Sequence, residues 1–329
     1  MTAVVVVGLG RMGSRYDAVP NPVPQSHIGA VLGTVGLSLA AAVDPDPEAR
    51  RLAATQWGDR LAGKLCADLP EAATQAVIVL CGPTACRKEH VVAALAHAPR
   101  LLLLEKPLAG SLAEAAAIVT LLRNAGVPAR VNFHRRFDPG FRSLRAAFHG
   151  RPLGATFRYG KGLFNYGSHA VDLMTEWLGV PVEVQGLGRP TSSPIGAEDP
   201  NLSFRCRSRD GAEALFLAVS GCPYDLFEGE VLFEDGMAWF SGGGGERRVF
   251  RPQAGVHYKG YAHLCEESRE TGQVAGLPGL YAAIRDHVSS GAPLPGCTPE
   301  HALAGMNVLD AALRSSATGG QSMMMEEFA

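Results

Sequence analysis

The sequence of 329 residues contains no pair of cysteines with CxxC spacing, and its number of cysteines, seven, is odd. A structural zinc site or a disulfide framework is therefore not indicated, and we expect reduced, mostly buried thiols and no bound metal. No basic segment precedes the first apolar run, and no uncharged stretch reaches the ~20 residues that a membrane helix needs. We expect a cytoplasmic protein without a membrane partner.

Charge is also scarce, because charged residues make up 19% of the chain and the net charge is −2. Neither value favours a nucleic-acid partner or an acidic surface. Apolar residues make up 47%, which allows sizeable cores and argues against disorder. At ~100–200 residues per domain, the length suits two domains.

The first 133 residues alternate short apolar runs with helical patterns. Strands are expected at 4–7, 37–43, 64–66, 76–80, 101–104 and 129–133, with helices at 47–56, 86–97 and 111–124. This alternation predicts an α/β Rossmann domain with a parallel sheet covered on both faces. Prolines 20, 22 and 24 interrupt the first crossover, so we expect a short helix near 11–18, a loop, and a second helix near 26–35.

Residues 134–329 show a different pattern, in which most strands alternate apolar and polar positions. Strands are expected at 154–160, 202–208, 212–220, 228–234, 237–240 and 247–251, and helices at 141–148, 167–178, 277–289 and 299–314. This predicts an α+β domain with an open, mainly antiparallel sheet that serves substrate binding and oligomerisation. The last helix, near 299–314, is allowed to pack on the Rossmann domain. Leu215, Leu217 and Val219 give the exposed sheet face an apolar stripe, which favours a homodimer or homotetramer formed through this sheet.

A glycine motif, Gly8-Leu9-Gly10-Arg11-Met12-Gly13, follows a strand of four valines. In a dinucleotide-binding turn, Gly8 permits the bend, Gly10 admits a pyrophosphate and Gly13 allows close packing of helix and strand. Asp44 ends the next expected strand, where a carboxylate accepts from a ribose hydroxyl. It lies beyond the usual ~20 residues from the motif, and the proline-rich insertion accounts for the excess.

A second motif, Glu105-Lys106-Pro107, follows the apolar strand 101–104. Strand ends of this kind face the ligand crevice, and Pro107 keeps Lys106 out of helical angles. A lysine with a depressed pKa can donate or accept a proton there. A surface charge pair in a turn is the alternative. The sharp bend favours a cis Lys106–Pro107 bond.

A third motif places Asn165 four residues before His169, with Asp172 further on. Both side chains can face one direction if a helix begins here, and the histidine can then point into a cleft. A histidine that only caps or fills the helix is the alternative.

Four further residues are weaker candidates. His134 ends the last Rossmann strand and could contact substrate, or could mark a domain junction. Lys161 could bind a hydroxyl or phosphate, although a solvated loop lysine is the simpler interpretation. Thr84 and His90 could line the nicotinamide ribose, or could cap and pad the helix 86–97.

Together these motifs resemble the Gfo/Idh/MocA oxidoreductase family over essentially the full chain. The resemblance also rests on Arg135-Arg136-Phe137 with Pro139, on the Gly160–Asp172 stretch, and on residues 298–315. It implies an NAD(P)-dependent dehydrogenase with catalytic Lys106, His169 and Asn165. It also implies a cofactor on Gly8, Gly10, Arg11, Met12, Gly13, Asp44, Thr84 and Glu105, and a sugar-like substrate near Lys106, His134, Lys161, Asn165 and His169.

The sequence departs from the family at Asn165, where many members carry Asp, and in the insertion Pro20–His27. Both features resemble a branch associated with surface-polysaccharide or nucleotide-sugar chemistry. An Asn cannot share a proton with His169, so Lys106 becomes the main candidate for proton transfer. The expected reaction is hydride transfer between nicotinamide and a carbinol or keto carbon of a sugar, sugar derivative or cyclitol.

Two alternatives stay open: a redox-assisted glycoside hydrolase with tightly bound NAD, and a dinucleotide-binding sensor or regulatory protein without catalysis. Asp44 favours NAD, because a carboxylate repels the 2′-phosphate of NADP, while Arg50 and Arg51 leave NADP open.

Overall fold

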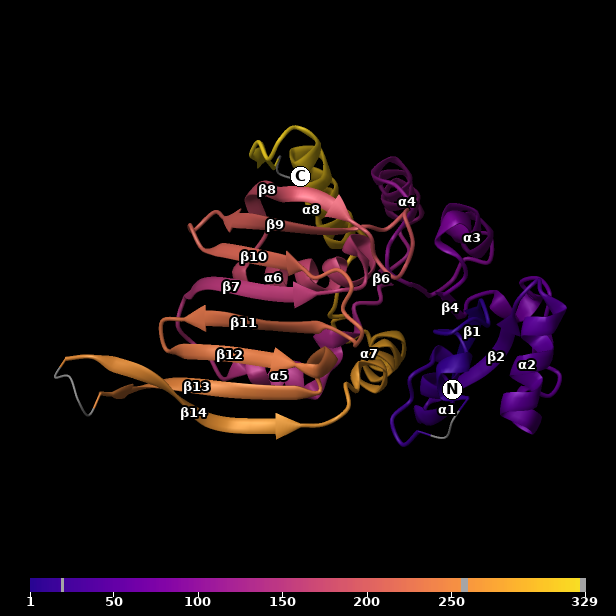
Figure 1. The fold of residues 1–329 in the computed structure, drawn as a ribbon. Coiled ribbons are helices and arrows are strands. Elements are labelled where there is room, and N and C mark those ends of the chain that lie inside the picture. The colour runs from indigo at the N-terminus through magenta and orange to yellow at the C-terminus, as the bar shows by residue number, and fades with distance from the viewer. Residues whose placement is uncertain (19–20, 256–259, 326–329) are drawn as a thin grey trace. The chain divides into compact units, whose positions relative to one another are not determined.

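The computed structural model describes residues 1–18, 21–255 and 260–325. The chain divides into two compact units (Figure 1). The first contains residues 1–138 and 275–303, and the second contains residues 139–274 and 304–329. Among the described residues, no helix is both long and apolar enough to span a membrane.

The first unit is built on a six-stranded sheet in the order β3-β2-β1-β4-β5-β6. All its neighbouring strands are parallel, which confirms the predicted Rossmann fold. The strands are β1 (Thr2–Val7), β2 (Leu37–Val43), β3 (Leu65–Cys66), β4 (Val77–Leu80), β5 (Leu101–Leu104) and β6 (Ala129–Val131). The helices are α1 (His27–Gly33), α2 (Pro47–Trp57), α3 (Arg87–Leu95), α4 (Leu112–Ala125) and α7 (Gly276–Ser290).

Helix α1 continues a helical turn that the insertion interrupts. The N–H of His27 donates to the carbonyl of Met12 at 2.8 Å, and the N–H of Ile28 donates to that of Gly13 at 3.0 Å. The described residues 14–18 and 21–26 therefore lie outside what would otherwise be one crossover helix. The expected helix near 11–18 is reduced to a 3-10 turn over Arg15–Asp17. The expected helix does not form because the three prolines cannot lie inside one continuous helix. The helical path of Met12 and Gly13 continues into α1 instead.

Asp17 holds the two ends of this insertion together. Its Oδ1 accepts from the N–H of Gln25 at 2.8 Å, and its Oδ2 accepts from the N–H and the hydroxyl of Ser26 at 2.9 and 2.6 Å. Ser26 in turn caps α1, because its Oγ accepts from the N–H of Gly29. The insertion thus ends in an ordered helix start.

The second unit contains a nine-stranded sheet in the order β14-β13-β12-β11-β7-β10-β9-β8-β15. Among the described residues of this sheet, β7 and β10 pair in parallel and the other neighbouring strands are antiparallel, so the predicted mainly antiparallel sheet is confirmed. The strands are β7 (Pro152–Tyr159), β8 (Pro181–Thr191), β9 (Asn201–Ser208), β10 (Glu213–Ala218), β11 (Phe227–Phe233), β12 (Gly236–Ser241), β13 (Glu246–Ala254), β14 (Ala262–Thr271) and β15 (Met323–Met324).

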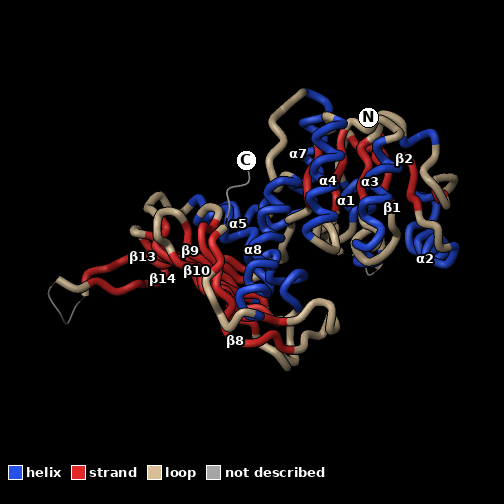
Figure 2. Tube along the Cα trace, turned by 90° about the horizontal axis from the view of Figure 1, so that it is seen from above, coloured by secondary structure: helices blue, strands red, loops and turns tan. Residues whose placement is uncertain are grey.

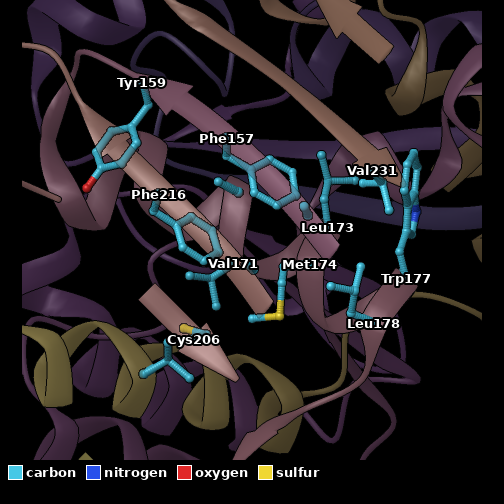
Figure 3. Packing of buried hydrophobic residues seen from close by; sticks show 14 of the residues in the cluster. Phe157, Tyr159, Val171, Leu173, Met174, Trp177, Leu178, Cys206, Phe216 and Val231 are labelled. Atoms are coloured by element: carbon cyan, nitrogen blue, oxygen red, sulfur yellow. The ribbon is translucent and has the colours of Figure 1, made fainter. Parts of the chain in front are cut away.

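Helices α5 (Pro139–Ala146), α6 (Ser168–Leu178) and α8 (Pro299–Ala317) pack on this sheet. Figure 2 shows α5 and α8 along one side of it. The core between sheet and helices joins stacked Phe157 and Phe216 to Val171 and Met174 of α6 (Figure 3). Because only one face is covered, the strands alternate buried and exposed positions, as the sequence pattern predicts.

The sequence pattern suggested one domain boundary between residues 133 and 134, but each of the two units consists of two separate segments of the chain. Residues 275–303, which include α7, belong to the first unit. The reason is the apolar face of α7, since Leu280, Tyr281 and Ile284 are fully buried in the core that covers β1, β4 and β5. The last helix, α8, begins in the first unit, while Val308 and Leu309 are buried in the core of the second.

Candidate cofactor and active site

Each glycine of the turn after β1 has a different steric environment. Gly8 has a φ of +98°, and Gly13 is so close to the Gly8 carbonyl that a Cβ there would lie 1.8 Å from its oxygen. At Gly10, by contrast, the nearest heavy atom to such a Cβ, a guanidinium nitrogen of Arg15, is 4.0 Å away. The backbone at Gly10 is therefore open to a close ligand, as a pyrophosphate requires.

Asp44 lies directly after β2 and contacts this turn. Its Oδ2 accepts from the N–H of Leu9 at 2.8 Å, and its Oδ1 accepts from the N–H of Asp46 at 3.0 Å. The carboxylate thus fixes the glycine turn, a role that the sequence did not reveal. A carboxylate has about four acceptor positions, so these bonds leave capacity for a ribose hydroxyl.

Arg15 is a residue that the sequence interpretation missed. It lies near the start of the insertion and is exposed, and one nitrogen of its guanidinium is 4.0 Å from the position of a Cβ on Gly10. Arg11, the residue that the motif suggested, is also exposed. The position of Arg15 depends on the path of the insertion, which no local motif encodes. A guanidinium is a cation that suits phosphate groups.

Glu105 lies at the end of β5 in a buried hydrogen-bond network. Its Oε1 bonds His27 Nε2 at 2.8 Å and accepts from Asn132 Nδ2 at 2.5 Å, and His27 Nδ1 bonds the hydroxyl of Tyr281 at 2.8 Å. Burial alone would raise the pKa of Glu105. The hydrogen bonds and charge of His27, the Asn132 amide and the neighbouring Lys106 outweigh it and hold that pKa at about 2. Glu105 is therefore an ionised carboxylate inside the unit.

Lys106 follows directly and is partly buried, and the Lys106–Pro107 bond is cis, as predicted. His134 lies beyond the end of β6 in the same unit. Burial, followed by the charge of Arg135, lowers the pKa of His134 to about 3, so the ring is neutral. Thr84 starts a 3-10 turn after β4 and is partly exposed. Beside this turn, burial lowers the pKa of His90, whose ring would contact a Cβ on Gly82 at 2.8 Å.

Asn165 and His169 lie in the second unit. Asn165 belongs to a π-helical turn over Gly162–Gly167, and His169 lies in the first turn of α6, 5% exposed and edge-on to Phe227. The expected regular helix therefore begins later, at Ser168. π-helical turns occur frequently at functional sites.

A carboxylate fixes this π-helical turn. Asp199 accepts from the N–H groups of Phe164 and Asn165 at 2.7 and 2.9 Å. Lys161, just before the turn, forms an ion pair with Asp225 at 3.1 Å, and Tyr166 donates to the same carboxylate. Lys161 is thus a partly exposed lysine in an ion pair, not the solvated loop lysine of the simpler interpretation. Its contact with a substrate stays a prediction. Among the described residues, no group of three or more His, Cys, Asp or Glu side chains could hold a metal ion.

Comparison with known proteins agrees with this geometry. Residues 2–133 match the model of the oxidoreductase family with the NAD-binding Rossmann fold. A myo-inositol dehydrogenase of Streptomyces leeuwenhoekii is 34% identical over 143 residues, which cover 44% of this chain and 40% of that protein. The alignment therefore spans only two fifths of that relative's length.

Solved structures resemble the whole chain. The WlbA dehydrogenase from Bordetella pertussis, in complex with NADH and UDP-GlcNAcA, has a TM-score of 0.73 at 18% identity, covering 99% of both chains. An oxidoreductase from Agrobacterium radiobacter, in complex with NAD⁺, L-tartaric acid and magnesium, has a TM-score of 0.74 at 17% identity, covering 98% of both. At these identities the likeness establishes the fold.

The sheet order and the glycine turn give the first unit a Rossmann fold, and its residues 2–133 are similar to the oxidoreductase family with the NAD-binding Rossmann fold. This match covers less than half of the chain, and it lies within the first unit.

Proposed function

We propose that this protein is a dehydrogenase that transfers hydride between a nicotinamide dinucleotide and a carbinol or keto carbon of a sugar, sugar derivative or cyclitol. The observation that carries the proposal is the open backbone at Gly10 on the same sheet edge as Lys106. The named activity of the Streptomyces relative and the nucleotide-sugar ligand of the Bordetella structure support the substrate class.

NAD is the proposed cofactor, with its pyrophosphate over Gly10–Met12, its adenosine ribose on Asp44, and Thr84 and Glu105 nearer the nicotinamide. The free acceptor capacity of Asp44 supports this choice, because a 2′-phosphate would meet a like charge there. When bound, the nicotinamide supplies the hydride acceptor or donor.

Lys106 is the proposed acid–base group. As the carbinol carbon loses hydride, the hydroxyl proton passes to the neutral Lys106 amine, and the ammonium returns it in the reverse direction. His169 and Asn165 assist by hydrogen-bonding the same hydroxyl, and His134 contacts the substrate.

The test is NADH production on a panel of sugars, nucleotide sugars and cyclitols. Lys106→Ala should lower kcat by on the order of 10²–10⁴ without weakening NADH binding, and His169→Ala should cost less. Lys88→Ala, on the exposed side of α3, is the matched control. Full turnover by Lys106→Ala would refute the mechanism. Glycoside cleavage without net NADH would favour the hydrolase, and NADH binding without any turnover would favour the sensor.

We also propose a homodimer or homotetramer formed through the exposed sheet face of the second unit. Leu217 and Val219 are 36% and 38% exposed there, and Leu215 is partly buried. The surrounding face is charged and internally paired, as in the Arg205–Glu213 and Arg207–Glu183 ion pairs. Light scattering of Leu217→Arg should show a smaller species than the wild type. A monomeric wild type at micromolar concentration would refute the assembly.

A further inference from the structure

The insertion after the glycine turn lies at the edge of the sheet where the proposed cofactor binds. Strand β1 ends at Val7, so the residues that follow it belong to the carboxyl edge of the parallel sheet, where ligands of this fold bind. The insertion (described residues 14–18 and 21–26) leaves the glycine motif directly after Gly13 and returns at His27. Its side chains are therefore candidates for a contact with that cofactor.

Arg15 is fixed to the glycine motif through its backbone. The N–H groups of Ser14 and Arg15 both donate to the carbonyl of Gly10 at 3.0 Å. One guanidinium nitrogen of Arg15 is 4.0 Å from the position of a Cβ on Gly10, and outside the two neighbouring residues of Gly10 no heavy atom comes closer. The side chain thus ends beside the open backbone along which a pyrophosphate would lie.

Hydrogen bonds hold the insertion on both sides of Arg15. Before it, Ser14 is fully buried, its Oγ accepts from Trp57 Nε1 at 2.9 Å, and its carbonyl accepts from Gln56 Nε2 at 3.0 Å. After it, the carboxylate of Asp17 accepts three hydrogen bonds from the far end of the insertion. The backbone that carries Arg15 is thus fixed by the protein itself, and this lowers the entropic cost of a contact with a ligand.

The guanidinium of Arg15 is available to a ligand. The residue is exposed, and it forms no ion pair with a carboxylate among the described residues. A guanidinium beside an open glycine backbone suits a ligand with two adjacent phosphates, because its planar fork can bind two phosphate oxygens at once. The pyrophosphate is the part of a dinucleotide that offers such oxygens at a glycine turn.

We propose that Arg15 is a further cofactor-binding residue, which contacts the pyrophosphate of the dinucleotide where it passes Gly10, and that the insertion serves to present this cation. The inference rests on the proposed cofactor and adds to it a residue outside the glycine motif. It depends neither on Lys106 nor on the identity of the substrate.

Fluorescence titration with NADH tests the contact without turnover. Arg15→Ala should weaken NADH binding about tenfold at low salt, toward the lower end for a hydrogen bond between charged groups, because the site is open to solvent. Arg15→Lys keeps the charge without the fork and should lose less. At about 1 M NaCl the difference between Arg15→Ala and the wild type should shrink, because the screening length falls to ~3 Å.

A matched control and a stability measurement separate this contact from a structural effect. Arg60 is exposed and lies between α2 and β3, at the opposite edge of the sheet, so Arg60→Ala should bind NADH as the wild type does. The urea midpoint of Arg15→Ala should also stay unchanged, because alanine keeps the backbone hydrogen bond to Gly10. A loss of affinity that does not respond to salt would point to a structural effect and would overturn the inference.

ADP-ribose and NADPH identify the part of the cofactor that Arg15 contacts. ADP-ribose carries the pyrophosphate without the nicotinamide, so its affinity, measured by competition with NADH, should fall by the same factor in Arg15→Ala. An unchanged affinity for ADP-ribose would contradict the proposal. A loss confined to NADPH would also contradict it, because Arg15 would then lie at the 2′-phosphate.

Asp17→Ala tests whether the insertion acts through Arg15. Release of the far end of the insertion should weaken NADH binding in the wild type and have no further effect in the Arg15→Ala background. Equal losses in both backgrounds would mean that the insertion does not serve to present Arg15. A wild type that binds neither NADH nor ADP-ribose would refute the proposed cofactor as well, whereas undiminished binding by Arg15→Ala would refute the role of Arg15 alone.

Discussion

Gly10→Ala should separate cofactor binding from folding. A Cβ at Gly10 would meet no heavy atom closer than 4.0 Å, and the φ of Gly10 lies outside the left-handed region. The fold should therefore accept alanine, and the free energy of unfolding should stay the same or rise by ~0.4–1 kcal/mol, because alanine restricts the unfolded chain. The new methyl would nevertheless occupy the space that a pyrophosphate needs.

The expected loss is about 10–100-fold in NADH affinity, equivalent to ~1.4–2.8 kcal/mol. Gly13→Ala provides the contrast, because its Cβ would lie 1.8 Å from the Gly8 carbonyl oxygen. The turn must then shift, so this variant should lose ~1–3 kcal/mol of stability in addition to affinity.

Urea denaturation and NADH fluorescence titration measure the two effects separately. If Gly10→Ala binds NADH as tightly as the wild type, the pyrophosphate does not lie over this turn. If Gly10→Ala unfolds as readily as Gly13→Ala, the open space at Gly10 is filled by protein, and the steric argument is wrong.

Three further outcomes follow from the structure. Asp44→Ala should weaken NAD about tenfold and NADP less, measured by titration, since only the unphosphorylated ribose uses the carboxylate; an equal loss for both would argue against this role. Asp17→Ala removes the acceptor for three donors in the insertion and should lower the free energy of unfolding by about 2 kcal/mol in urea. An unchanged midpoint would mean that these hydrogen bonds do not stabilise the fold. The pKa of His134 is about 3, below the ordinary value of ~6.5, so the unfolded chain takes up the proton before the folded protein does. The free energy of unfolding should therefore fall as the pH drops from ~6.5 toward 3, by up to ~1.4 kcal/mol per pH unit. His134→Gln should flatten that part of the stability profile, and an equally steep profile would place the titration elsewhere.

The sequence predicted the buried strands well, because a parallel sheet covered on both faces leaves uninterrupted apolar runs such as 101–104. It did not predict β8, β14 or β15. Strand β8 contains Pro181, Gly186, Gly188 and Pro190, which are turn signals in isolation. Strand β14 lies at the sheet edge with almost every residue exposed, so its sequence carries no apolar alternation.

The residues of the candidate site also differ in whether the sequence alone could identify them. Gly8, Gly10 and Gly13 could be assigned because their roles depend on the local backbone. His27 and Tyr281 could not, since they lie 78 and 176 residues from Glu105 and no sequence spacing connects them. The three prolines predicted the insertion, but the rejoining of the helix at Met12 and Gly13 depends on backbone hydrogen bonds that composition does not encode.

Helix α7 contributes both to the core of the first unit and to the hydrogen-bond network around Glu105. A Rossmann sheet needs helices on both faces, and the insertion leaves α1 only seven residues long, too short to cover its face of the sheet alone. Helix α7 packs beside α1 and supplies Leu280, Tyr281 and Ile284 to the same core. The hydroxyl of Tyr281 also bonds Nδ1 of His27, and Nε2 of His27 bonds Glu105. The segment that completes the core thus also contributes to the hydrogen-bond network around Glu105, so a perturbation of α7 should affect the stability of the unit and this network together.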